Sequence, residues 1–176
     1  NISSTRQKKS NKIEKKIYKK IKNIKIKKIE IISKLNDSMI YKDIINQNID
    51  YIISIGSPFI FNKKILSLYK NKIINSHGTP LPEYKGGGGL TWRYLNSDTR
   101  GVILYHYIDS KIDNGPIIYT HKFLFPKNKK IHDWINIQIK EEKKGIKKIL
   151  KSIYLGNKFK IKKHPKSMSS YFPRIN

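Results

Sequence analysis

The run at residues 51–55, Tyr-Ile-Ile-Ser-Ile, constrains the fold more than any other stretch of this chain. It has the length of a strand, and Gly56, Ser57 and Pro58 close it with a turn signal. A strand that is apolar without alternation is buried on both faces, which is typical of parallel sheets covered by helices. Strand-like and helix-like segments alternate along the chain around it. We therefore predict an α/β fold with a Rossmann-like, mostly parallel sheet and flanking helices.

Hydrophobic spacing and turn residues predict the other elements. Strands are predicted at residues 28–33, 72–75, 101–108 and 116–125, and helices at residues 36–47, 63–69, 91–96 and 133–154. Asp113, Asn114 and Gly115 give a turn between the last two strands, which we expect to pair. Ligands gather at the carboxyl ends of the strands in such sheets, so the segments after residues 55 and 75 are expected to face one cleft.

A chain of 176 residues suits a single folded unit, which we divide into three segments. Residues 1–27 are strongly basic, and isoleucines at positions 13, 17, 21 and 24 predict one apolar helix stripe. We favour a surface helix packed on the sheet over an arm that binds RNA or a membrane. Residues 28–156 are predicted to form the core, and residues 157–176 an irregular C-terminal extension.

The formal net charge of +26 would ordinarily indicate a polyanionic partner, because many lysines raise the local potential. The composition weakens that interpretation. The chain has no alanine and one valine, while Lys, Ile and Asn are abundant, a pattern expected of AT-rich coding sequence. Nucleic-acid binding is therefore kept as an alternative and is not the main hypothesis.

Zero cysteines exclude disulfides, zinc–thiolate sites and a cysteine nucleophile. No apolar run approaches the ~20 residues of a membrane-spanning helix, so we expect a cytoplasmic protein without a membrane partner. We also expect no metal site, because none of the other histidines pairs with a carboxylate at a ligand-like helical spacing. These histidines are His106, His121, His132 and His164.

Three polar residues carry the candidate chemistry. Asn75 and His77 stand two residues apart at the end of an apolar run, so on a strand their side chains share one face. An amide donor, a titrating ring and the carboxylate of Asp113 are the parts needed to stabilise an oxyanion and move a proton in acyl transfer. Ser57, Ser76 and Thr79 lack the tight elbow of an activated nucleophile, so direct transfer to a substrate amine fits better than a covalent enzyme intermediate.

Four consecutive glycines, Gly86, Gly87, Gly88 and Gly89, form a second unusual feature. No Lys-Ser or Lys-Thr follows them, which argues against a phosphate-binding loop. Two interpretations stay open: a backbone that approaches a ligand closely, and a flexible connector.

These motifs together resemble the folate-dependent formyltransferases, a group that includes glycinamide ribonucleotide, methionyl-tRNA and sugar-nucleotide N-formyltransferases. The resemblance is carried by residues 75–86, Asn-Ser-His-Gly-Thr-Pro-Leu-Pro-Glu-Tyr-Lys-Gly, and by Ile-Asp-Asn-Gly-Pro-Ile-Ile at residues 112–118. It covers about residues 28 to 174. The first strand–helix unit of the family's fold is not visible in this sequence, and both ends look shortened relative to the family.

The resemblance implies specific roles for the candidate residues. Asn75 and His77 would stabilise the tetrahedral oxyanion formed when an amine attacks the formyl carbon of 10-formyltetrahydrofolate, and Asp113 would hold His77 charged and help to remove the amine proton. The implied cofactor-binding residues are Gly56, Ser57, Pro58, Phe59, Ile60 and Asp109. The implied residues on the side of the substrate amine are Thr79, Gly86, Gly87, Gly88, Gly89 and Trp92.

The Gly-Gly-Gly-Gly-Leu-Thr-Trp version of the loop and the Ser-Ser-Tyr-Phe-Pro-Arg segment at residues 169–174 resemble a sugar-modifying branch of the family. We therefore expect formylation of an amine on a small molecule, an amino-sugar nucleotide. The alternatives are methionyl-tRNA formylation and an inactive, basic nucleic-acid-binding domain on the same scaffold. A homodimer stays open.

Overall fold

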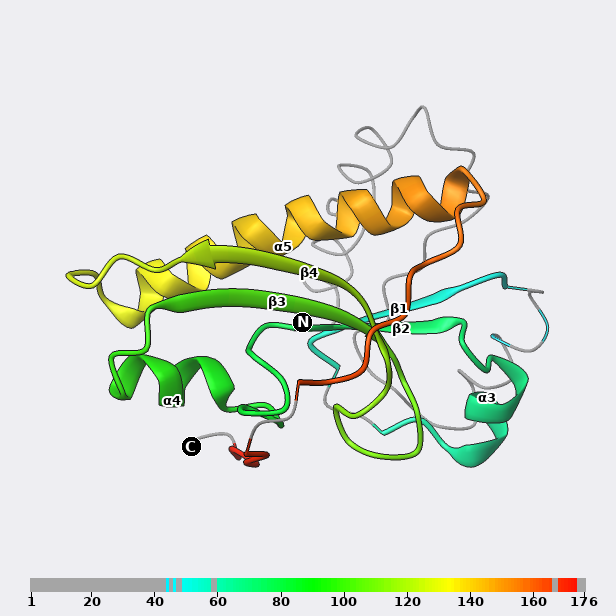
Figure 1. The fold of residues 1–176 in the computed structure, drawn as a ribbon, viewed down its shortest axis with the longest axis horizontal. Coiled ribbons are helices and arrows are strands. Elements are labelled where there is room, and N and C mark those ends of the chain that lie inside the picture. Colours follow the sequence, from blue (N-terminus) through cyan, green and yellow to red (C-terminus); the bar gives the residue numbers. More distant parts are fainter. Residues whose placement is uncertain (1–43, 45, 47–48, 58–59, 166–167, 174–176) are drawn as a thin grey trace, which may run out of the picture.

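The computed structural model describes residues 44, 46, 49–57, 60–165 and 168–173 (Figure 1). The predicted basic helix at residues 1–27 and the predicted strand at residues 28–33 lie outside this part. So does most of the predicted helix at residues 36–47, of which Ile44 and Asn46 are described and helical.

The described strands form one sheet in the order β1-β2-β3-β4. Their bounds are Ile52–Ile55, Ile73–His77, Arg100–Tyr107 and Ile117–Leu124. The helices are α3 at Lys63–Leu68, α4 at Gly89–Leu95 and α5 at Ile131–Tyr154. Each of these lies within a few residues of the element predicted from the sequence.

The α/β class is confirmed, but the described strands form a mixed sheet rather than a mostly parallel one. β1 and β2 are parallel, whereas β2 with β3 and β3 with β4 are antiparallel. Parallel neighbours need a crossover of a dozen or more residues, and the short segment between β3 and β4 allows only a hairpin. This hairpin is the pairing that the Asp113-Asn114-Gly115 turn predicts.

Helix α5 covers one face of the sheet and α3 the other (Figure 1). Because side chains alternate along a strand, Ile74 packs toward Ile149 of α5 while Ile73 packs toward Ile65 of α3. A third apolar group lies beside the candidate site and contains Leu81, Leu104 and Ile117. The end of β2 is thus fixed between two packed layers.

Local signals explain where the helices begin. The Asn62 side chain accepts a hydrogen bond from the Ile65 amide at 3.0 Å, which caps α3. At the start of α5, Asp133 accepts a hydrogen bond from the Lys130 amide at 3.2 Å and places a negative charge in the first turn. Trp134, Gly145 and Ile149 then form the buried stripe of α5.

The C-terminal segment returns to the sheet without forming a helix within its described residues. It makes two isolated bridges, Lys162 with Ile117 and Tyr171 with Lys85.

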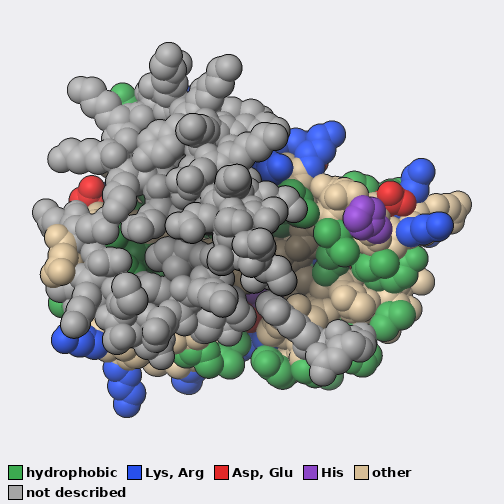
Figure 2. All heavy atoms as spheres, turned by 180° about the vertical axis from the view of Figure 1, so that it is seen from behind, with side chains coloured by type: hydrophobic (Ala, Val, Ile, Leu, Met, Phe, Trp, Pro, Cys, Tyr) green, Lys and Arg blue, Asp and Glu red, His purple; other side chains and the backbone are tan. Residues whose placement is uncertain are grey.

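On the face drawn in Figure 2, the visible Lys and Arg side chains lie in separate places. None of the described helices has both the length and the apolar character that a membrane crossing requires.

Candidate active site

The candidate site lies where β2 ends. Asn75 and His77 point away from α5, because Ser76 between them points toward it. In the antiparallel ladder Asn75 is paired with His106 and His77 with Leu104 of β3. On the other side of β3, its pairing with β4 has a register shift at Tyr105 and His106.

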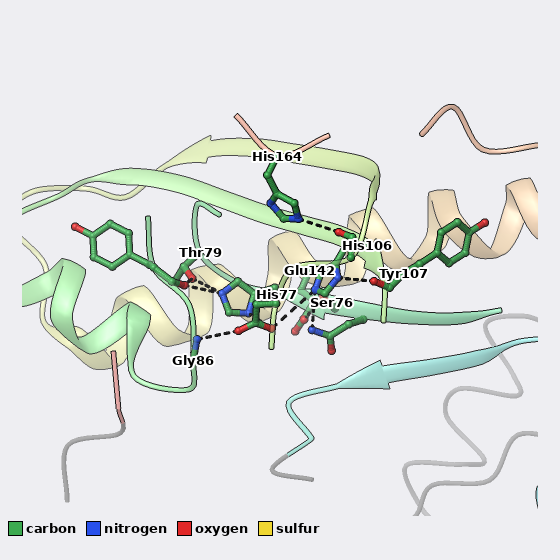
Figure 3. A network of polar contacts seen from close by, with 12 residues as sticks. Ser76, His77, Thr79, Gly86, His106, Tyr107, Glu142 and His164 are labelled. Carbon is green, nitrogen blue, oxygen red and sulfur yellow. Dashed lines mark hydrogen bonds and ion pairs between the residues drawn. The ribbon is translucent and has the colours of Figure 1, made fainter. Parts of the chain in front are cut away.

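His77 is held in one orientation by the loop that follows it (Figure 3). Its Nε2 lies 2.8 Å from the Tyr84 carbonyl and 2.7 Å from Thr79 Oγ1, and Thr79 Oγ1 donates to the same carbonyl at 2.8 Å. A carbonyl oxygen can only accept, so Nε2 carries a proton. The other ring nitrogen, Nδ1, then faces Asp113.

Asp113 is brought to His77 by the hairpin between β3 and β4. Its Oδ2 accepts a hydrogen bond from the Gly86 amide at 2.8 Å, and its Oδ1 lies 3.5 Å from His77 Nδ1. Asp113 has a φ of 47°, a left-handed conformation that Asp tolerates better than most residues and that often marks a functional site. The turn also needs Gly115, since a Cβ there would lie 1.8 Å from the Tyr107 carbonyl.

His106 completes the cluster, although the sequence interpretation did not include it. The ring is 2% exposed, and burial lowers the pKa of His106 to about 4, so it is neutral. Its Nδ1 donates to the Tyr107 carbonyl at 2.9 Å, which leaves Nε2 to accept from Asn75 Nδ2 at 3.1 Å. The same Nε2 lies 3.9 Å from Asp113 Oδ1. The signal that could have found His106 is the predicted strand at residues 101–108, once paired with β2.

The glycine run packs against the chain itself. The Gly88 amide donates to the Phe172 carbonyl at 3.1 Å, and a Cβ on Gly88 would lie 1.9 Å from the Pro173 carbonyl. A Cβ on Gly89 would lie 2.8 Å from Thr79 Cγ2. Nearby, Trp92 Nε1 donates to the Pro173 carbonyl at 3.1 Å. The missing side chains therefore allow close packing, and contact of Gly86, Gly87, Gly88, Gly89, Thr79 and Trp92 with a substrate stays a prediction.

The predicted cofactor residues lie on two loops near the cluster. Gly56 follows β1 with a φ of 59°, and Ile60 is 76% exposed, while Pro58 and Phe59 lie outside the described residues. Asp109 accepts a hydrogen bond from the Lys111 amide at 2.9 Å, so its carboxylate shapes the hairpin loop. The structure places Gly56, Ser57, Ile60 and Asp109 after β1 or β3, and their contact with a cofactor stays a prediction.

The Rossmann-like α/β fold and the Asn–His–Asp cluster at a strand end define a core suited to acyl transfer. The family model described as Formyl transferase matches residues 2–150, and the chain belongs to this family. The resemblance stated from the sequence is thereby confirmed.

Three similar proteins show the range of the family. The methionyl-tRNA formyltransferase of Finegoldia magna is 27% identical over 88 residues, which are 50% of this chain and 28% of that protein. The formyltransferase PseJ from Anoxybacillus kamchatkensis, solved with UDP-4,6-dideoxy-4-formamido-L-AltNAc and tetrahydrofolate, is 28% identical with a TM-score of 0.65. The match covers 82% of this chain and 71% of that one.

The N-formyltransferase from Helicobacter canadensis, solved with folinic acid and dTDP-3-aminofucose, is 31% identical with a TM-score of 0.54. The match covers 60% of this chain and 39% of that one. The match to the methionyl-tRNA formyltransferase of Finegoldia magna covers 28% of that protein, so this chain spans well under half of its length.

Proposed function

We propose that this chain is the catalytic core of a formyltransferase that moves a formyl group from 10-formyltetrahydrofolate to the amine of an amino-sugar nucleotide. The observation that carries the proposal is the convergence of Asn75, His77 and Asp113 at the end of β2. Asn75 and Asp113 are 38 positions apart (113 − 75) but lie on either side of the His106 ring. His106 Nε2 is 3.1 Å from Asn75 Nδ2 and 3.9 Å from Asp113 Oδ1, and that carboxylate oxygen is 3.5 Å from His77 Nδ1.

Each residue of the cluster has a distinct task in the proposed reaction. 10-formyltetrahydrofolate supplies the formyl group. When an amine attacks a formyl carbon, negative charge develops on the formyl oxygen. Asn75 donates a hydrogen bond to this oxygen through its second amide hydrogen, and the positive charge of protonated His77, whose N–H groups point to Tyr84 and Asp113, stabilises it. Asp113 stabilises protonated His77 through Nδ1 and takes the proton that the attacking nitrogen loses, directly or through a water molecule. The new carbon–nitrogen bond would form first and give the oxyanion. Its collapse would then break the old carbon–nitrogen bond, with that proton delivered to the departing nitrogen.

The residues beside the cluster fit the proposed donor. A pterin is a flat heteroaromatic ring, and large apolar side chains are exposed on both neighbouring loops, Ile60 at 76% and Ile112 at 49%. We assign donor binding to Gly56, Ser57, Pro58, Phe59, Ile60 and Asp109. The tetrahydrofolate and folinic acid in the two solved relatives support this choice of donor.

The proposed acceptor is supported by the same relatives, since both were solved with a sugar nucleotide. In this chain, Thr79, the glycine run and Trp92 would line the acceptor side. Tyr84 and Phe172 stack beside the glycine run at 4.8 Å between ring centroids.

The direct test is an assay of tetrahydrofolate release. Purified protein is mixed with 10-formyltetrahydrofolate and, separately, with UDP- and dTDP-linked amino sugars, glycinamide ribonucleotide or methionyl-tRNA, and the formylated product is identified by mass spectrometry. We expect turnover with an amino-sugar nucleotide. Absence of formyl transfer to every amine would overturn the proposed reaction, and turnover only with another acceptor would overturn the acceptor.

Methionyl-tRNA formylation is the second candidate, because the curated relative from Finegoldia magna has that activity in its name and the chain carries a net charge of +26. This candidate predicts that turnover falls steeply as salt is raised, since phosphate contacts release counterions. An inactive nucleic-acid-binding domain predicts the same salt dependence for RNA binding and no turnover.

A cytoplasmic location and a homodimer stay predictions, which cell fractionation and sedimentation would test.

A further inference from the structure

The reverse side of β2 carries a polar contact that the proposed chemistry does not use. Ser76 lies between Asn75 and His77 and points to the opposite face, where its Oγ donates a hydrogen bond to Glu142 Oε1 of α5 (Figure 3). Ser76 is 7% exposed. A carboxyl group is thus placed at the interface between helix and sheet, where an apolar side chain would ordinarily pack.

The position of Glu142 is itself fixed by neighbouring contacts. The Tyr105 hydroxyl of β3 donates to the Glu142 carbonyl at 2.8 Å. Gly145, one turn further along α5, makes room for that ring, because a Cβ there would lie 2.4 Å from the Tyr105 hydroxyl oxygen. These contacts seat α5 on the strand next to β2 and bring the Glu142 side chain directly to Ser76.

A second contact from α5 reaches the residue after His77. A Cβ on Gly78 would lie 2.1 Å from Gln138 Nε2, so the Gln138 side chain lies against the Gly78 backbone. Gln138 and Glu142 are four residues apart and therefore occupy the same face of α5. One helix face supports both Ser76 and Gly78, which precede and follow His77.

We propose that Glu142 is a positioning residue, which holds Ser76 from behind and thereby fixes how Asn75 and His77 are presented to the substrate. The inference rests on the proposed formyltransferase function. A rotation of the strand about its axis would move the side chains on the front face together, and the Ser76–Glu142 bond opposes that rotation. Small misplacements of reacting groups cost large factors in rate, so a contact on the reverse face affects the rate without touching substrate.

The kinetic test uses Glu142→Ala, Glu142→Gln, Ser76→Ala and the double variant Ser76→Ala/Glu142→Ala. We expect each alanine variant to lower kcat about 10-fold with little change in the KM of donor or amine. The double variant should be no worse than either single variant, because each single substitution already removes the same Ser76–Glu142 hydrogen bond. Glu142→Gln keeps an oxygen that can accept from Ser76 and should restore kcat to within about 2-fold of wild type. Additive losses in the double variant would overturn the proposal.

The matched control is Glu141→Gln, one residue earlier on the same helix. Glu141 pairs with His121 at 2.7 Å and with Lys144 at 2.6 Å, away from β2. We expect this substitution to leave kcat unchanged. A loss of kcat in Glu141→Gln as large as the loss in Glu142→Ala would mean that the helix is only perturbed in general, and would overturn the proposal.

A second readout does not depend on turnover. In heteronuclear NMR spectra of the folded protein, Glu142→Ala should move the ring resonances of His77 and leave those of His121 in place, whereas Glu141→Gln should do the reverse. If Glu142→Ala does not fold, Ser76→Ala carries the same test from the strand side. Unmoved His77 resonances would overturn the positioning role even if the wild type is active. A wild type that transfers no formyl group would instead refute the proposed function, and the His77 resonances would still decide the positioning role.

Discussion

Two carboxylate clusters lie at opposite ends of β3 and are built differently. Asp98 precedes the strand and Asp113 follows it, and both side chains are 13% exposed. Asp98 accepts hydrogen bonds from Arg100 N, Nε and Nη2 at 3.1, 2.9 and 2.8 Å. Asp113 accepts one such bond, from Gly86, and faces His77 and His106 at 3.5 and 3.9 Å. The clusters therefore differ in hydrogen-bond saturation and not in burial.

This difference supports a stabilising role for Asp98 and the proposed reactive role for Asp113. Burial alone would raise the pKa of Asp98, but hydrogen bonds from Arg100 and the charge of Arg93 lower it to about 2. Arg93 is fully buried beside it, between the rings of Tyr84 and Phe125. Asp98 has no remaining capacity for a substrate, whereas Asp113 Oδ1 is held only at ion-pair range and can accept a proton.

The largest effect is expected at Asp113. We predict that Asp113→Asn lowers kcat on the order of 100-fold or more, because the amide can neither stabilise protonated His77 nor take up a proton. The melting temperature should change little, since Asn keeps the acceptor for the Gly86 amide. Steady-state kinetics and thermal unfolding on the same preparation test this. Wild-type kcat in the variant would remove Asp113 from the mechanism.

Asp98→Ala should show the opposite pattern. We predict a loss of about 3 kcal/mol in the free energy of unfolding, because buried Arg93 loses its ionic partner, with kcat of the folded protein unchanged. Urea titration measures the loss. The Asp98 pKa is below its ordinary value, so its contribution is present above about pH 4 and is lost as the pH falls toward 2. Unaltered stability would show that Asp98 is not the stabilising member of the pair.

His106→Leu should have a smaller effect on rate, about 10-fold, because Asn75 loses the acceptor that orients it. The pH dependence gives a second test. The pKa of His106 is depressed to about 4, so the unfolded chain takes up the proton first, and the stability that the neutral ring contributes above about pH 6.5 is lost as the pH falls toward 4. The variant should lack this part of the acid destabilisation in denaturant titrations. Identical pH profiles would contradict the neutral state of the ring.

The smallest effect is expected for Glu142→Gln on stability. Burial raises the pKa of Glu142, although the Ser76 hydrogen bond lowers it in part. A raised pKa stabilises the fold at low pH, and this contribution is lost as the pH rises. The neutral variant should therefore gain stability relative to wild type between about pH 4.5 and neutral pH. Denaturation midpoints across this range measure the difference, and a constant difference would contradict the raised pKa.

Much of this architecture could be predicted from local patterns. The apolar run at residues 51–55, the helical spacing of residues 133–154 and the Asp113-Asn114-Gly115 turn each gave an element close to its observed bounds. The sequence could place Asn75 and His77 side by side because alternate residues of a strand share one face, whatever the rest of the fold is. His106 was missed because its pairing with Asn75 depends on the register between β2 and β3, which no local pattern gives.

The amino-acid sequence by itself determined the elements, the turn and the residue types available for catalysis, because hydrophobic periodicity and turn chemistry act over a few residues. Only the tertiary structure decided that Asp113 meets Gly86 and His77, and that Ser76 meets Glu142 behind the site. Contacts across 27 to 66 residues depend on strand register and on how a helix is seated. No local pattern encodes these relations, since they arise only when the whole core packs.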